Sequence, residues 1–264
     1  MPTGNELLMD PYSTVLVGGP SGSGKTSLIA HALKQPTMCP IYVFDFDLRL
    51  SSLLAVTLPD KLAMLSYDQY RDTASLPGSA FTAAEAKLRA LTDMFIKQPH
   101  DAPKTIVLDS LTFCQRVVMN RVLVMDGKPA TSNPELQHYK SLMNTVEPFI
   151  SRLTALPCNI IVTAHDDPVT DKATNMSYIG IDMTGQLATR LPGYFNEVWH
   201  AELASGARPI DPMTYRLRTR SSNIHRCRTC FPAYLDMLED ATQVWAKIEK
   251  AHQDAVAKVL KILV

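Results

Sequence analysis

Residues 19–27, GPSGSGKTS, combine small residues with one lysine and four hydroxyl side chains. Their spacing fits the pattern G-x-x-x-x-G-K-[ST] at every fixed position, and the apolar segment 14–18 precedes them. Glycines allow consecutive backbone N–H groups to surround an anion, and a helix that begins there points its positive end at the same anion. We therefore predict that this phosphate loop binds the phosphates of a nucleoside triphosphate.

Single residues of the phosphate loop have predictable tasks. Lys25 can reach the β- and γ-phosphates, and the hydroxyl oxygen of Thr26 can bind Mg²⁺. No guanine-reading N-K-x-D element occurs in the chain, so the expected cofactors are ATP and Mg²⁺. The residues expected to bind the nucleotide are Gly19, Pro20, Ser21, Gly22, Ser23, Gly24, Lys25, Thr26 and Ser27.

Asp109 is the second candidate ligand of the metal. It ends the apolar run TIVLD, within a strand expected at 104–110. A carboxylate at the carboxyl end of a parallel strand faces the crevice that holds ligands in open α/β sheets. We predict that Asp109 binds Mg²⁺ together with Thr26, directly or through water, with Ser110 beside it. The alternative is that Asp109 or Ser110 caps the helix that follows.

Two acids, Asp45 and Asp47, end the apolar strand expected at 41–46. Because side chains alternate along a strand, both can face one side near the edge that carries the phosphate loop. We predict that Asp47 orients or deprotonates the water that attacks the γ-phosphate, and that Asp45 supports the loop or the metal by hydrogen bonds. The alternative is a solvated strand end with turn-forming acids.

His165 ends another buried segment, NIIVTAH, at 159–165. If this strand lies between the phosphate-loop strand and the Asp109 strand, His165 lies beside the γ-phosphate. We then predict that His165 senses the nucleotide and relays its presence to the loop that follows. The alternative is a polar residue that only closes the strand.

The elements that must position these residues alternate between strands and helices, which predicts an α/β fold with a mostly parallel sheet and helices on both faces. Strands at 197–203 and 213–220 predict a C-terminal antiparallel hairpin, and residues 166–195 are given no regular structure. Helices are expected from the phosphate loop to Lys34 and at 82–97, 111–125, 134–155 and 239–262. One domain is expected, 1–264, with a core at about 12–222 and a C-terminal helical extension at about 236–264.

Taken together, the motifs resemble the RecA fold family. More narrowly, they resemble the phage ATP-binding proteins regarded as RecA-like single-strand annealing recombinases. The resemblance implies a RecA-like P-loop core, DNA-stimulated ATP hydrolysis, single-stranded DNA as a partner and self-association into a ring or filament. A single-strand-binding protein is a further partner candidate. The segments that carry the resemblance, over about residues 12–222, are GGPSGSGKTS, VFDFDLRL, TIVLDSLT, NIIVTAHDD and TGQLATRLPGYFNEVWH.

The sequence departs from the family pattern at two positions. The catalytic carboxylate of RecA-like proteins is normally Glu, and the matching residue here is Asp47. Its side chain is one CH₂ shorter, so hydrolysis would be slow or the geometry adjusted. The polar residue before the DNA-facing loop is often Gln; here it is His165, as in several relatives.

The resemblance also implies that residues 166–193 form a mobile DNA-facing loop. Lys172, Tyr178 and Arg190 are its candidate nucleic-acid contacts, because bases stack on aromatic rings and phosphates attract cations. Four aspartates in the same segment make it a poor attractor of phosphates. The alternative is an ordinary surface loop.

Six arginines and one aspartate lie between residues 208 and 228. We expect Arg218 and Arg220 to enter the nucleotide site of a neighbouring subunit, as basic residues do in RecA-like assemblies. The alternatives are a nucleic-acid groove and a solvated basic face. The further nucleic-acid candidates in this segment are Arg208, Arg226 and Arg228.

Composition excludes several classes of protein. Basic and acidic residues number 26 each, so no overall field attracts nucleic acid or an anionic membrane. No apolar run approaches the roughly 20 residues that span a bilayer. Five cysteines without a disulfide framework indicate a reducing compartment. We expect a soluble protein with no membrane partner, in the cytoplasm of a bacterial host if a phage encodes it.

Cys227 and Cys230 lie near His225, a pattern that invites a zinc interpretation. A structural zinc site needs four ligands at a recognisable spacing, and no second cysteine pair lies within reach along the chain. The pair is therefore left without an assigned role.

Three rival functions remain beside the recombinase. A hexameric helicase or packaging-type motor uses the same core, usually with a further domain. A nucleotide or small-molecule kinase needs an acceptor pocket and an arginine-bearing lid, which the segment 208–228 could imitate. A nucleotide-gated binding module with negligible turnover is compatible with the shorter Asp47.

Overall fold

The computed structural model describes residues 12–55, 57, 59–170, 175, 177–204 and 213–262. The strands are β1 (Thr14–Gly18), β2 (Ile41–Asp45), β3 (Leu65–Gln69), β4 (Thr105–Asp109), β5 (Asn159–Thr163), β6 (Asp166–Thr170), β7 (Ser177–Ile181), β8 (Glu197–Ala204), β9 (Thr214–Arg218) and β10 (Leu238–Asp240). The α-helices are α2 (Ser27–Ala32), α3 (Pro59–Leu62), α4 (Ser79–Lys97), α5 (Leu111–Met125), α6 (Leu136–Thr154), α7 (Leu187–Arg190) and α8 (Val244–Ile262). Short 3₁₀ helices are η1 (Pro36–Met38), η2 (Leu50–Ala55) and η3 (Leu191–Tyr194).

The main sheet has eight strands in the order β10-β9-β8-β1-β5-β4-β2-β3. All pairs from β8 to β3 are parallel, whereas β9 and β10 are antiparallel additions at one edge. This confirms the predicted α/β fold with a mostly parallel sheet and a C-terminal antiparallel hairpin. Within the described part of the chain, no helix is both long and apolar enough to cross a membrane.

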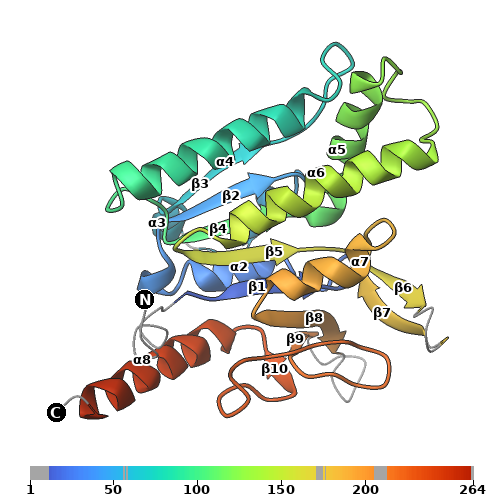
Figure 1. Cartoon of the computed structure of the whole chain (residues 1–264). Helices are drawn as coiled ribbons and strands as arrows, with labels where there is room; N and C mark the ends of the chain where they lie inside the picture. The colour runs from blue at the N-terminus through green and yellow to red at the C-terminus, as the bar shows by residue number, and fades with distance from the viewer. Residues whose placement is uncertain are drawn as a thin grey trace.

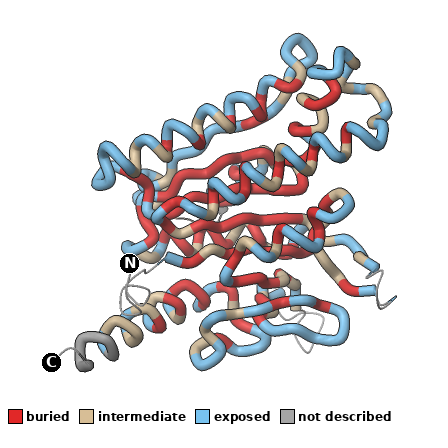
Figure 2. The backbone as a smooth tube through the Cα atoms, in the orientation of Figure 1, coloured by how far each residue is buried: buried red, intermediate tan, exposed pale blue. Residues whose placement is uncertain are grey.

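Helices cover both faces of the sheet because alternate strand residues point to opposite sides. Leu16, Phe44 and Leu108 pack in the core that α4, α5 and α6 cover. Val17 and Val43 face the other way, toward α2 and the first turns of α8. Figure 1 shows α4, α5 and α6 on one side of the sheet, and Figure 2 shows the central strands as the most buried part of the chain.

Two sequence expectations are wrong. Residues 166–195, given no regular structure, form β6, β7, α7 and η3; β6 and β7 make a two-stranded sheet of their own, and most residues of β6 are exposed. Residues 65–69, to which the sequence assigns no element, form the edge strand β3; it is largely exposed and therefore lacks a strong apolar pattern. The helix expected from 239 begins at Val244, because Leu238–Asp240 pairs with β9 as a strand.

Candidate nucleotide-binding site

The carboxyl ends of the parallel strands β1, β5, β4 and β2 lie along one edge of the sheet. The phosphate loop follows β1, Asp109 is the last residue of β4, and Asp47 follows β2. Strand β5 lies between β1 and β4, which is the arrangement that the prediction for His165 requires. The fold therefore brings the sequence-predicted groups to the same edge.

The Lys25 side chain is buried inside the phosphate loop. Its ammonium donates hydrogen bonds to the carbonyl oxygens of Gly19 at 2.7 Å and Pro20 at 2.8 Å. Burial lowers the pKa of Lys25, and the neighbouring carboxylates of Asp109 and Asp47 oppose that shift. The loop thus holds a cation among small residues, as a phosphate site requires.

Gly24 is the position of the loop with the least room. Its φ is +84°, in the left-handed region that strains any residue with a Cβ. A Cβ at Gly24 would lie 2.5 Å from Cδ1 of Tyr215 on β9. The ring of Tyr215 therefore covers the phosphate loop at this point, a contact that the sequence did not indicate.

Gly24→Ala is expected to lower the free energy of unfolding by about 2–4 kcal/mol, because it adds both backbone strain and a clash with the ring. In a Tyr215→Ala background only the strain remains, so the same change should cost about 1–2 kcal/mol. Urea unfolding of the four proteins of this cycle measures both costs. Equal costs in the two backgrounds would contradict the steric contact.

Asp109 is almost fully buried between two threonines. Thr26 donates its hydroxyl to Oδ2 at 3.0 Å, and Thr163 donates to Oδ1. Burial raises the pKa of Asp109 to about 6, and the negative charges of Asp47 and Asp45 add to the shift. The predicted metal ligands Thr26 and Asp109 are thus in direct contact at the start of α2.

Asp45 holds the turn that carries Asp47. Its buried carboxylate accepts hydrogen bonds from the Leu48 backbone N–H at 2.7 Å and from Gln69 Nε2 at 3.1 Å. Leu48 has a φ of 60°, which is uncommon for a residue with a side chain. The hydrogen bond to Leu48 stabilises this turn, and the predicted support of the phosphate loop or the metal by Asp45 stays a prediction.

Asp47 and His165 face each other across the site. Oδ2 of Asp47 lies 4.0 Å from Nε2 of His165, and Oδ1 lies 3.6 Å from Nε of Arg49. Burial and the nearby Lys25 lower the pKa of His165, so its imidazole is neutral at pH 7. A neutral imidazole beside a carboxylate can accept or donate a hydrogen bond without carrying charge.

A hydrogen-bonded link runs from His165 to the end of β7. The backbone N–H of His165 donates to Oγ1 of Thr112 at 3.0 Å, and this hydroxyl donates to the Asp182 carbonyl oxygen at 3.3 Å. Asp182 N–H donates to the His165 carbonyl oxygen at 2.7 Å, and Gln115 Nε2 reaches the Asp182 carbonyl at 3.1 Å. Sequence reasoning missed Thr112 and Gln115; their only signal was their polarity within an otherwise apolar helical face.

The residues present fit a magnesium nucleotide. Hydroxyl and carboxylate oxygens are the ligands that Mg²⁺ prefers, and Thr26 and Asp109 supply both. Four buried polar atoms of the phosphate loop and of the chain that follows β2, β4 and β5 make no hydrogen bond within the described residues, and such atoms normally have partners. They are Ser23 Oγ, Asp47 Oδ1, Ser110 Oγ and His165 Nε2.

The sequence profile of one protein family, described as the AAA domain, matches residues 12–227. The chain belongs to the AAA domain family. It is therefore a P-loop ATPase that uses ATP and Mg²⁺, as the phosphate loop and Asp109 predicted. No curated protein matches the sequence.

Solved structures similar to this AAA-domain protein include the flagellar accessory protein FlaH from Methanocaldococcus jannaschii, with 12% identity and a TM-score of 0.44 over 86% of this chain and 83% of that one. A type III secretion ATPase from pathogenic bacteria has 14% identity and a TM-score of 0.42, over 71% and 50% of the two chains. EscN from enteropathogenic E. coli, solved with its central stalk EscO, has 14% identity and a TM-score of 0.46, over 73% and 44%. The AAA-domain chain thus spans half or less of the secretion ATPases.

Arg218 lies on the same edge of the AAA domain as the phosphate loop. It pairs in register with His200, which in turn pairs with Gly18 at the end of β1. Its guanidinium donates to Glu202 of the same chain at 2.9 Å. Its task in a neighbour's nucleotide site stays a prediction.

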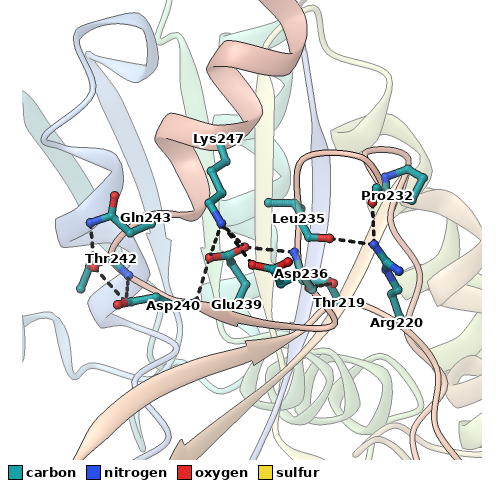
Figure 3. A network of polar contacts seen from close by, with 10 residues as sticks. All are labelled: Thr219, Arg220, Pro232, Leu235, Asp236, Glu239, Asp240, Thr242, Gln243 and Lys247. Carbon is teal, nitrogen blue, oxygen red and sulfur yellow. Dashed lines mark hydrogen bonds and ion pairs between the residues drawn. The ribbon is translucent and has the colours of Figure 1, made fainter.

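Arg220 is held by its own chain. Figure 3 shows its guanidinium donating to the carbonyl oxygens of Pro232 and Leu235, the latter at 3.0 Å. In the same network, Lys247 of α8 pairs with Glu239 at 2.8 Å and anchors the helix to β10. These contacts give Arg220 a structural task, and its predicted action as a finger remains untested.

The nucleic-acid candidates are also engaged within the chain. Arg226 lies over the ring of Tyr178, 3.8 Å from its centroid, and the tyrosine is buried. Arg190 lies 3.6 Å from Glu147. Arg228 donates to the carbonyl oxygens of Pro192 and Phe195. Two further candidates, Lys172 and Arg208, lie outside the described residues.

Cys227 is buried and Cys230 is exposed, and both are free thiols. Among residues that the structure describes, no group of three or more His, Cys, Asp or Glu side chains could hold a metal ion.

Proposed function

We propose that this AAA-domain ATPase is an ATP-dependent single-stranded-DNA-binding protein that serves recombination or strand annealing. The observation that carries the proposal is the hydrogen-bonded link from His165 through Thr112 to Asp182. It joins the edge that holds the nucleotide to the β6–β7 hairpin, the segment that the family resemblance assigns to DNA. A change at the γ-phosphate could thereby alter the hairpin's affinity for a single strand.

The chain's own residues have distinct tasks in this proposal. Lys25 and the N–H groups of the phosphate loop hold the phosphates, and Thr26 with Asp109 would hold Mg²⁺, which neutralises charge on the transferred group when bound. Asp47 orients the attacking water, and His165 responds to the γ-phosphate. Most of the catalytic effect would come from positioning and charge stabilisation.

Self-association into a ring or filament is part of the same proposal. Arg218 lies on the phosphate-loop edge of the sheet, where a short rearrangement of its pair with Glu202 would free the guanidinium. An arginine supplied by a neighbour stabilises charge in the transition state of phosphoryl transfer. DNA binding and assembly would then favour turnover together.

The test is ATP turnover without nucleic acid, with single-stranded DNA and with duplex DNA, using Lys25→Ala as the blank. We expect single strands to raise turnover by about 5-fold or more, within the usual range of coupling between sites. The affinity for single strands, measured by fluorescence anisotropy, should rise when a non-hydrolysable ATP analogue is present. The proposal would be refuted if DNA did not change ATP turnover and the ATP analogue did not change the affinity for DNA.

Thr112→Val removes the hydroxyl that joins His165 to Asp182 and keeps the shape of the side chain. It is expected to reduce the coupling factor between ATP analogue and single strand. Reciprocity requires that the effect of the analogue on DNA affinity and the effect of DNA on analogue affinity fall by the same factor. An unchanged coupling factor would show that the link is only structural.

A further inference from the structure

An open pocket of about 330 Å³ lies beside Asp47, apart from the β6–β7 hairpin. Its walls come from three segments: the turn after β2, the chain after β3, and the first turns of α5. Arg71 lines it from the chain after β3, and Arg116 lines it from α5. Both arginines are exposed.

These two arginines have no direct polar partner among the described residues. Within the described part of the chain, neither guanidinium forms an ion pair or hydrogen bond, although Arg116 lies 4.6 Å over the ring of Phe113. Several other arginines of the described residues do pair with carboxylates, among them Arg49, Arg121, Arg152, Arg190 and Arg218.

The two acids of the pocket are directed elsewhere. Asp72 accepts the Ala80 N–H at 3.0 Å and Asn120 Nδ2 at 2.9 Å, so both of its oxygens are used to fix the start of α4 against α5. Asp47 faces Arg49 and His165. The lining thus carries two acids and two arginines, and the donors of the two guanidiniums are the charged groups that the surrounding structure does not engage.

We infer that this pocket binds a phosphodiester group of single-stranded DNA between Arg71 and Arg116; the inference rests on the proposed function. Arginine binds phosphate oxygens through a planar fork of donors, and it suits this ligand better than lysine does. The ring of Phe113 positions Arg116 on one side and contacts the His165 ring at a centroid distance of 5.7 Å on the other. Single-stranded DNA bound in this pocket would thus be linked through Phe113 to His165, the residue predicted to lie beside the γ-phosphate.

The salt dependence of DNA binding tests the assignment. Each phosphate of a single strand that the protein neutralises contributes about 0.7 to the slope of log K against log salt concentration. In the presence of a non-hydrolysable ATP analogue, the double variant Arg71→Gln/Arg116→Gln should therefore reduce the slope by about 0.7, and each single variant by part of that amount. The matched control is Arg89→Gln, an exposed arginine of α4 that does not line the pocket, and it should leave the slope unchanged.

A second variant separates charge from folding. Arg71→Lys/Arg116→Lys keeps both charges and should retain most of the wild-type slope, and thermal unfolding shows whether each variant is folded. If wild-type protein binds single strands and the double Gln variant keeps the wild-type slope, the inference is overturned while the proposed function stands. If wild-type protein binds no single strand, both fall together. Phosphorylation of a nucleoside monophosphate that needs Arg71 and Arg116 would instead assign the pocket to a phosphoryl acceptor and overturn the inference.

Discussion

Asp47→Asn is expected to lower ATP turnover by about 10²–10⁴-fold, the usual contribution of a positioned general base. The carboxylate lies 4.0 Å from the His165 imidazole at the edge that holds the phosphates, and its Oδ1 is buried without a hydrogen bond among the described residues. An amide keeps the shape of the side chain but accepts a proton far less readily. ATP affinity should be nearly unchanged, because the phosphate loop supplies the binding contacts.

Single-turnover hydrolysis and equilibrium binding of an ATP analogue, measured on the same protein, separate these two effects. The matched control is Asp47→Glu, which keeps the carboxylate and restores the side-chain length normal in RecA-like proteins. We expect this variant to remain active. Turnover of Asp47→Asn within tenfold of wild type would exclude Asp47 as the group that activates the water and would assign that task to another residue.

Most of the nucleotide site could be predicted from the sequence because its residues lie at the ends of strongly apolar strands. The phosphate loop, Asp109 and His165 each follow such a strand, and parallel strands bring their carboxyl ends to one edge. The prediction for His165 required a particular order of strands in the sheet, and the hydrophobic periodicity of the sequence does not indicate that order. The position of β5 between β1 and β4 depends on long-range pairing, which a local pattern does not contain.

The partners of the arginines could not be predicted from the sequence. A count of charges between 208 and 228 gives an excess of cations, but it does not show that Arg218 meets Glu202 or that Arg220 meets backbone carbonyls near Pro232. Conversely, Arg71 and Arg116 lie 45 positions apart in segments that carry no motif. Their shared pocket arises only from the packing of α5 beside the end of β3.

The β6–β7 hairpin was not predicted from the sequence, for a different reason. Its strands form a two-stranded sheet of their own, so few of their side chains are buried and the alternation of apolar and polar residues is weak. Tyr178 gains burial from Arg226 above its ring. That contact spans almost 50 positions of the chain, and only the fold could reveal it.

Asp109→Asn is expected to abolish Mg²⁺-dependent turnover, with a loss of about 10³-fold or roughly 4 kcal/mol in the barrier, and to stabilise the nucleotide-free protein above pH 7. Burial raises the pKa of Asp109 from 3.8 to about 6. The folded chain therefore binds this proton more tightly than the unfolded chain does. The carboxyl's contribution to stability is full below pH 3.8 and is lost as the pH rises through about 6.

At pH 8 the buried carboxylate is ionised, which disfavours the folded state by an amount on the order of 1–3 kcal/mol. Asparagine carries no charge, and the hydroxyls of Thr26 and Thr163 can rotate to satisfy its amide. Urea unfolding without nucleotide should therefore show a gain of about 1–2 kcal/mol for the variant at pH 8, with little or no gain at pH 4.5. Mg²⁺ with an ATP analogue should reverse the order, because only wild-type protein gains metal-dependent binding energy. A difference between the two proteins that is the same at both pH values would mean that Asp109 is not held by burial at a raised pKa.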